Sequence, residues 1–132
     1  MGVPVLVFVG IGTEITHLHP STDGGTIGEL SMRDFRIFCQ QLTGLDKTGV
    51  VLNVGSVVIL PEVFLKALTV VRNLGYPAEG FKAANFDMIQ HYLPSENVIT
   101  RPTRGGGKSY QITGHHEIML PLLDAGIIEK TG

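Results

Sequence analysis

Apolar residues are concentrated in short runs along the chain, and the clearest run lies at residues 50–54. Such a nearly continuous apolar segment is typical of a strand that is covered on both faces of a parallel sheet. A glycine and a serine interrupt the run, and residues 64–74 then place apolar side chains at helical spacing. Pro61 suits the first turn of a helix, and Gly75 suits its end. Residues 49–75 therefore predict a strand, a turn and a helix.

Similar patterns predict the other elements. We expect strands at residues 3–9, 50–54, 81–86 and 110–113. We expect helices at residues 31–44 and 118–128, and a third helix that has Pro61 in its first turn and ends before Gly75. A long connection is expected at residues 13–30, and a short helical turn at 87–92 precedes an irregular loop at 94–109. Because strands alternate with helices, we expect one α/β domain over residues 1–132, three-layered, with a mostly parallel sheet of about four to six strands.

The composition narrows the class of protein. Hydrophobic residues make up 43% of the 132 residues and charged residues 17%, so we expect a partner subunit to cover part of the surface. The net charge of -2 and the lack of a basic stripe argue against a nucleic-acid partner. The run at residues 3–9 is too short to span a membrane and lacks the features of a signal peptide. Cys39, the only cysteine, fits a small core residue in a reducing compartment, so a soluble cytoplasmic protein is expected.

The turn after residues 50–54 is the first candidate for a binding site. In parallel α/β sheets, ligands lie beyond the carboxyl ends of the strands and near helix N-termini. This position holds Asn53, Gly55, Ser56 and Glu62. The alternative is a structural turn between a strand and a helix, with no ligand.

The histidines are a candidate metal site. All five lie in three groups: His17 with His19, His91 alone, and His115 with His116. Imidazole and carboxylate groups together bind zinc and other divalent metal ions. This pattern suggests a metal-dependent hydrolase, with His17, His19 and His115 or His116 as ligands and Glu117 as the general base. The alternative is that these histidines form hydrogen bonds with the backbone in loops and at a helix start.

Other short motifs predict no chemistry. The segment 105–109 ends in Gly-Lys-Ser, but Pro102 stands where a phosphate-binding loop requires a glycine. Gly10 and Gly12 lack the third glycine and the immediate helix of a dinucleotide-binding turn.

Four segments occur in an order that resembles a known family. They are GVPVLVF at residues 2–8, DGGTIGE at 23–29, GVVLNVGS at 49–56 and HEIMLPLL at 116–123. Together they resemble the C-terminal half of deoxyhypusine synthase and its bacterial relatives. The resemblance covers nearly the whole chain, although each segment is short. Because the family is longer, we expect either a truncated relative or a second chain that covers the open sheet edge.

The resemblance implies a Rossmann-like sheet that binds NAD, in a homotetramer with active sites across subunit interfaces. Enzymes of this family transfer an aminobutyl group from spermidine through an imine on a lysine. The family's acidic loop corresponds to residues 23–29, its glycine-rich strand end to residues 55–56, and its asparagine-bearing strand to residues 84–87. With Glu62 added from the strand-end argument, the predicted cofactor contacts are Gly28, Gly55, Ser56, Asn85 and Asp87, and the predicted substrate contacts are Asp23, Gly24, Glu29 and Glu62.

The chain departs from the family where the reaction would occur. It contains no tryptophan, and residues 96–100, which correspond to the family's Trp-Gly-Lys motif, contain no lysine. We therefore predict a deoxyhypusine-synthase-like homo-oligomer, a dimer or tetramer, that binds NAD or a polyamine-like cation without the imine transfer. The alternatives are the metal-dependent hydrolase and a non-catalytic remnant that only oligomerises. The leading prediction requires Asp23 and Ser56 to face one shared crevice.

Overall fold

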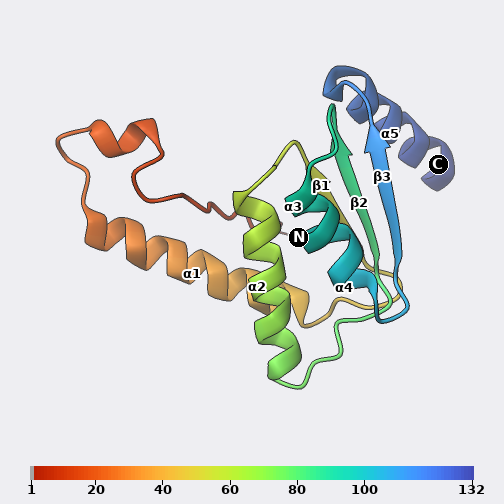
Figure 1. Cartoon of the computed structure of the whole chain (residues 1–132), viewed down its shortest axis with the longest axis horizontal. Coiled ribbons are helices and arrows are strands. Elements are labelled where there is room, and N and C mark those ends of the chain that lie inside the picture. Colours follow the sequence, from red (N-terminus) through yellow and green to blue (C-terminus); the bar gives the residue numbers. More distant parts are fainter. Residues whose placement is uncertain (1) are drawn as a thin grey trace.

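Three parallel strands lie side by side in chain order in the structure, a computed structural model that describes residues 2–132. They are β1 (Val50–Val54), β2 (Lys82–Asp87) and β3 (Lys108–Thr113), with β2 in the middle (Figure 1). The strands predicted at 50–54, 81–86 and 110–113 are confirmed to within two residues. The predicted α/β class with a parallel sheet is also confirmed, but within residues 2–132 the sheet has three strands and not four to six.

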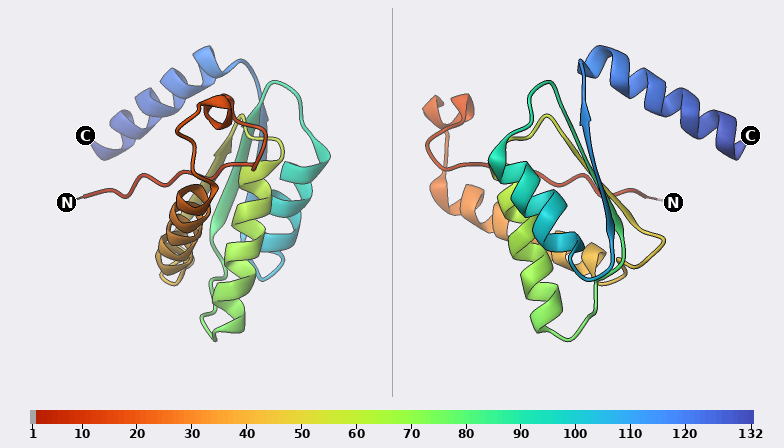
Figure 2. Two further views of the ribbon diagram at one scale, coloured as in Figure 1. Left: turned by 90° about the vertical axis from the view of Figure 1, so that its left-hand side faces the viewer. Right: turned by 45° about the vertical axis from the view of Figure 1, so that its right-hand side comes forward.

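One face of the sheet carries the hydrophobic core. Helix α2 (Ile59–Asn73) and the helical segment 92–103 lie against this face, on the same side of the sheet (Figure 2). Val51 and Ala83, which are paired in register, face this core. The buried core consists mainly of Phe64, Leu68, Val71, Phe81, Ala83, Val98 and Ile99. Burial of these side chains holds the helices against the sheet.

Helix α2 forms as the sequence predicts. Its buried residues Phe64, Leu68 and Val71 recur at helical spacing. Pro61 lies in the first turn, where a missing N–H breaks no intrahelical bond. Gly75 ends the helix with a φ of 91°, which glycine adopts without strain, and its N–H donates to the carbonyl oxygen of Arg72 (3.0 Å).

The segment 92–103 differs from the sequence prediction. We expected a helical turn at 87–92 and then an irregular loop, but the chain is helical through α3 (Tyr92–Pro94), the π-helix η2 (Ser95–Thr100) and α4 (Arg101–Thr103). Pro94 lies in the first turn, where its missing N–H is tolerated. Pro102 follows the wider π turn, which leaves room for the proline ring. Both prolines are buried, so packing stabilises a helix that local propensity disfavours.

Helix α1 (Gly24–Leu42) begins earlier than its predicted start at residue 31. Asp23 is the N-cap, and its Oδ2 accepts a hydrogen bond from the Thr26 N–H (2.6 Å). This bond satisfies a free amide of the first turn and offsets the poor helix propensity of the glycines there. The predicted connection at residues 13–30 is therefore shorter, and it contains a 3-10 helix, η1 (Ile15–Leu18).

Residues 2–10 form an extended arm and not the strand predicted at residues 3–9. Within the described residues, no backbone hydrogen bond joins the arm to β1. The Val7 N–H donates instead to the carboxylate of Asp34 (2.8 Å). Between the arm, β1 and α2 lies a largely apolar cavity of about 460 Å³, and among the residues that line it Asn53 is both polar and buried.

Helix α5 (His116–Thr131) is longer than the predicted 118–128. It runs on the side of the sheet opposite α2 and diverges from the strands toward its C-terminal end (Figures 1 and 2). It faces Phe86 and Ile112 across a cavity of about 360 Å³. Helices therefore lie on both sides of the sheet, but α5 has no buried residue and does not form the packed third layer that was predicted. The cover on this second face is partial, since Leu52 and Tyr110 remain exposed.

Candidate functional site

Polar side chains gather at the carboxyl ends of the strands. Asn53 of β1 and Asn85 of β2 are paired in register, and both are buried. Asn53 Nδ2 donates to Asn85 Oδ1 (2.6 Å) and to the carbonyl oxygen of Ser56 (2.8 Å). The first bond satisfies two amide groups in the interior, where unpaired amides are costly. The pair therefore connects β1 to β2 directly before the turn that the sequence indicated as a site.

Gln90 extends this network to β3. Its Oε1 accepts a hydrogen bond from Asn85 Nδ2 (2.7 Å). Its Nε2 donates to the carbonyl oxygen of Ile112 (3.2 Å) and to Thr113 Oγ1 (3.1 Å). Gln90 was not predicted as a site residue, because a single glutamine in the loop after a strand belongs to no recognisable sequence pattern. The amide network spans all three strand ends.

Asp87 ends β2, the central strand, and lies at the middle of this edge. Only 7% of the residue is exposed. Oδ1 accepts a hydrogen bond from the Met88 N–H (2.8 Å), whereas Oδ2 is buried and has no hydrogen-bond partner among residues 2–132. A buried carboxylate oxygen without a donor is unfavourable, so it calls for a functional explanation.

His116, the first residue of α5, reaches the same edge. Gly55 follows β1 and donates its N–H to the carbonyl oxygen of Phe86 (3.0 Å), which places Gly55 beside Asp87. Gly55 has a φ of 64°, and a Cβ atom there would lie 3.1 Å from His116 Nε2. Like Asp87 Oδ2, His116 Nδ1 is buried and has no partner in the described chain. Gly55 therefore lies between a carboxylate and an imidazole that each have an unused hydrogen-bonding atom.

The first turn of α2 is poorly suited to a phosphate group. Ser56 Oγ accepts a hydrogen bond from the Leu60 N–H (3.3 Å), so one of the first backbone N–H groups of the helix already has a partner. Pro61 has no N–H to offer. Glu62 places a carboxylate in the same turn, where a helix N-terminus otherwise attracts anions. This edge of the sheet suits a cation or a hydrogen-bond donor better than a pyrophosphate.

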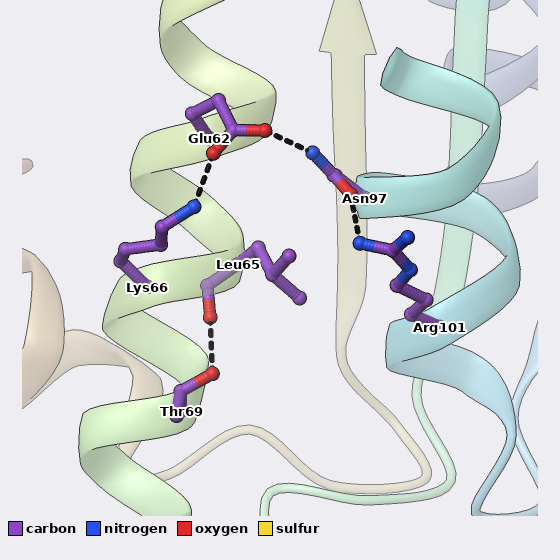
Figure 3. A network of polar contacts seen from close by, with 6 residues as sticks. All are labelled: Glu62, Leu65, Lys66, Thr69, Asn97 and Arg101. Atoms are coloured by element: carbon purple, nitrogen blue, oxygen red, sulfur yellow. Dashed lines mark hydrogen bonds and ion pairs between the residues drawn. The ribbon is translucent and has the colours of Figure 1, made fainter. Parts of the chain in front are cut away.

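Glu62 belongs to a polar network between α2 and η2 (Figure 3). One carboxylate oxygen accepts a hydrogen bond from Lys66 Nζ and the other accepts one from Asn97 Nδ2. Arg101 Nη1 donates to Asn97 Oδ1 (3.1 Å). The bond from Lys66 holds the pKa of the Glu62 carboxyl below its ordinary value, with smaller contributions from Asn97 and Arg101. Both oxygens are occupied, so the structure gives Glu62 a linking role in place of the predicted substrate contact.

Replacing Glu62 by glutamine should lower the melting temperature by about 1–3 °C at pH 7, because exposed ion pairs contribute little. The lowered pKa means that the folded chain favours the charged carboxylate. The contribution is therefore present above the ordinary pKa of 4.5 and is lost as the pH falls through the folded pKa. Thermal melts at decreasing pH measure this, and the curves of wild type and variant should converge in acid. Glu29→Gln, at an exposed position of α1, is the control. An equal shift in both variants at every pH would contradict the network.

The acidic segment lies apart from the strand ends. Asp23 starts α1 at the end that projects away from the sheet (Figure 1). The Thr26 side chain, and after it the Thr26 amide, lowers the pKa of Asp23, as expected for a helix cap. The depression beside Asp23 is lined by residues between 15 and 27, and none comes from a strand. Contrary to the predicted shared crevice with Ser56, the structure does not bring Asp23, Gly24, Gly28 or Glu29 to the strand ends.

The histidines do not form one cluster. The η1 helix, which contains His17, and α5, which begins at His116, lie at opposite ends of the molecule (Figure 1). His17 Nδ1 accepts a hydrogen bond from the Gly12 N–H (3.1 Å), and His19 Nδ1 lies 2.7 Å from Ser21 Oγ. Among residues 2–132, no three His, Cys, Asp or Glu side chains are close enough to hold a metal ion. The predicted ligand set of His17, His19, His115 and His116 is therefore not assembled.

Comparisons of the chain with models of protein families, with curated proteins and with solved structures find no match. Within residues 2–132, every helix is too short or too polar to cross a membrane. The chemistry of the strand edge is therefore the basis for a functional proposal. An ammonium group can donate a hydrogen bond to Asp87 Oδ2, and His116 Nδ1 is a second atom at this edge without a hydrogen-bond partner in the described chain.

Proposed function

We propose that the chain is a deoxyhypusine-synthase-like α/β domain that binds a small polyamine-like cation at the carboxyl edge of its sheet. The observation that supports this most directly is the buried Asp87 Oδ2, which has no donor in the described chain. A ligand ammonium group supplies the charge-assisted hydrogen bond that this oxygen lacks. The neighbouring amides of Asn53, Asn85 and Gln90 hold the strand ends in place around it.

The proposed ligand also needs room for its methylene chain. The cavity of about 460 Å³ between the arm, β1 and α2 reaches Asn53 at this end of the sheet. Phe8, Phe38 and Phe64 line it, so it offers apolar surface to an alkyl segment. Asn53 lines this cavity and is hydrogen-bonded to Asn85, two residues before Asp87, so we expect the alkyl segment of a bound amine to extend from Asp87 toward the cavity.

NAD is the second ligand class, and it fits this edge less well. Glycine at position 55 permits close approach of a ligand, and ribose hydroxyl groups can donate to Asp87. The pyrophosphate, however, would meet the Glu62 carboxylate and the missing N–H of Pro61 at the start of α2. We therefore expect NAD to bind more weakly than a polyamine.

The proposal does not include transfer chemistry through a lysine imine. Lys82 and Lys108 begin β2 and β3, so both lie at the amino edge of the sheet, opposite Asp87. Both are exposed, whereas a lysine that forms an imine with a substrate is desolvated or lies beside another cationic group. The function proposed here is therefore ligand binding.

Isothermal titration of the folded chain with spermidine tests the proposal. We expect binding that weakens as salt is added, because an ion pair contributes to it. The neutral compound 1,8-octanediol, of similar length, should produce no binding heat. Binding of the diol with equal affinity would contradict the role of the carboxylate. If NAD bound and spermidine did not, the ligand of this site would be a nucleotide and not a polyamine. If neither ligand produced binding heat, the proposal would be refuted.

A further inference from the structure

The sheet face opposite α2 is apolar and largely open. In register, this face carries Val50, Leu52 and Val54 from β1, Ala84 and Phe86 from β2, and Tyr110 and Ile112 from β3. Helix α5 covers the part of this face around Phe86 and Ile112. Leu52 is 46% exposed and Tyr110 is 49% exposed. Contiguous apolar surface of this kind marks an interaction site more often than plain solvent-facing surface.

Helix α5 shows the same excess of exposed apolar residues. The exposed members are Ile118, Leu120, Leu122, Ile127 and Ile128. They are distributed around the helix and do not form a single stripe. A helix that is apolar on all sides is typically buried. We name the combined surface of α5 and the open sheet face the α5 face, defined by Leu52, Val54, Tyr110, Ile118, Leu122 and Ile127.

The total surface area is large for a chain of this size. The accessible surface is 8826 Å² for a mass of 14.2 kDa. A folded monomer of this mass is expected to expose about 6,800 Å². The excess of about 2,000 Å² falls within the area that each subunit buries in an obligate homodimer, roughly 1,000 to 2,500 Å². The α5 face and the N-terminal arm both contribute to it.

We propose that a second copy of this chain covers the α5 face. The six defining residues carry no charge, so apolar side chains meet where two copies of these residues come together. Charged groups lie around them: Lys82 and Lys108 in the first row of the sheet, and Glu117, Asp124, Glu129 and Lys130 on α5 itself. A two-fold dimer brings the same patch of both chains together, which requires a self-compatible surface such as this one. The inference does not require the proposed ligand to be bound. Asn53, Asn85 and Asp87 point from the other face of the sheet, although Leu52 and Val54 of the α5 face also line the cavity beside the N-terminal arm.

Sedimentation or light scattering of the full chain measures the mass in solution. We expect a dimer at micromolar concentration for the wild type. Leu52→Asp should raise the dissociation constant by roughly 100-fold, because two-fold symmetry buries the new charge twice. Leu74→Asp places the same charge at a 70% exposed position just after α2 and should leave the dimer intact.

A second variant separates dissociation from misfolding. Ile127→Glu places a charge on α5, where the residue is half exposed and lies outside the main buried cluster. Circular dichroism should show an unchanged fold, while the mass falls to that of one chain. A monomeric wild type at about 100 μM would overturn the inference. A dimer that tolerates both Leu52→Asp and Ile127→Glu would overturn it equally, because another surface would then hold the two copies together.

Discussion

Replacing Asp87 by asparagine should weaken spermidine binding by roughly 10- to 100-fold, because a charge-assisted hydrogen bond is lost. In the absence of ligand, the same change should raise the free energy of unfolding by about 1 kcal/mol. The gain is expected because Oδ2 is buried without a donor, and a neutral amide is less costly there than a carboxylate. The amide oxygen can still accept the hydrogen bond from the Met88 N–H. Titration calorimetry and urea denaturation measure the two effects.

Asp23→Asn is the matched control for this experiment. It removes the same charge by the same chemical change, and asparagine retains the N-cap of α1. We expect its spermidine affinity to equal that of the wild type. If Asp23→Asn weakened binding as much as Asp87→Asn, the acidic segment would belong to the site. If Asp87→Asn reduced stability and left binding unchanged, Asp87 would be a structural residue.

Replacing Phe81 by alanine should lower the free energy of unfolding by about 3–5 kcal/mol. Phe81 directly precedes β2, is fully buried and packs edge-on against Phe64 of α2, with ring centroids 6.2 Å apart. Its removal leaves a cavity between the sheet and the helices that cover it. The loss is a large part of the roughly 5–15 kcal/mol that stabilises a typical domain.

Urea denaturation at a fixed protein concentration measures this loss. Leu74→Ala is the control, because Leu74 is 70% exposed and its loss should change the free energy of unfolding by less than about 0.5 kcal/mol. Similar midpoints for Phe81→Ala and the wild type would show that the core is not organised around this ring. Phe81 lies at the amino end of β2, far from Asp87. At urea concentrations where the Phe81→Ala variant is still folded, it should therefore bind spermidine as tightly as the wild type does.

The sequence predicted the elements whose signals are local. The β1–α2 unit combines an apolar run, a glycine turn, Pro61 and Gly75, and each signal acts within a few residues. The helix at 92–103 was missed because Pro94 and Pro102 normally end helices, and only burial against the sheet explains their presence. The arm at residues 2–10 was predicted as a strand because an apolar pattern indicates extended backbone but does not specify the neighbour that completes its hydrogen bonds.

The site was predicted in part for the same reason. Gly55 and Ser56 were placed at this edge because the carboxyl ends of parallel strands converge wherever the chain folds into such a sheet, whereas Asn85 and Asp87 were assigned by the family resemblance. Asp23 was assigned to the same crevice by resemblance, and its role as the cap of α1 depends on where that helix begins. His116 was predicted as a metal ligand, yet its position beside Gly55 depends on the placement of α5 across the sheet. Such contacts between distant segments are absent from any local pattern.

The Asn53–Asn85 bond has a consequence for how the strands come together during folding. The preceding core-facing pair, Val51 and Ala83, is apolar and makes no polar contact that would fix the position of one strand along the other. A slip of one strand would separate the two amides and leave both in the interior without a partner. The hydrogen bond between the two asparagines therefore favours the native register of β1 and β2. Sheets in which one strand has slipped are less stable, so the register is selected before the strand ends form the binding edge.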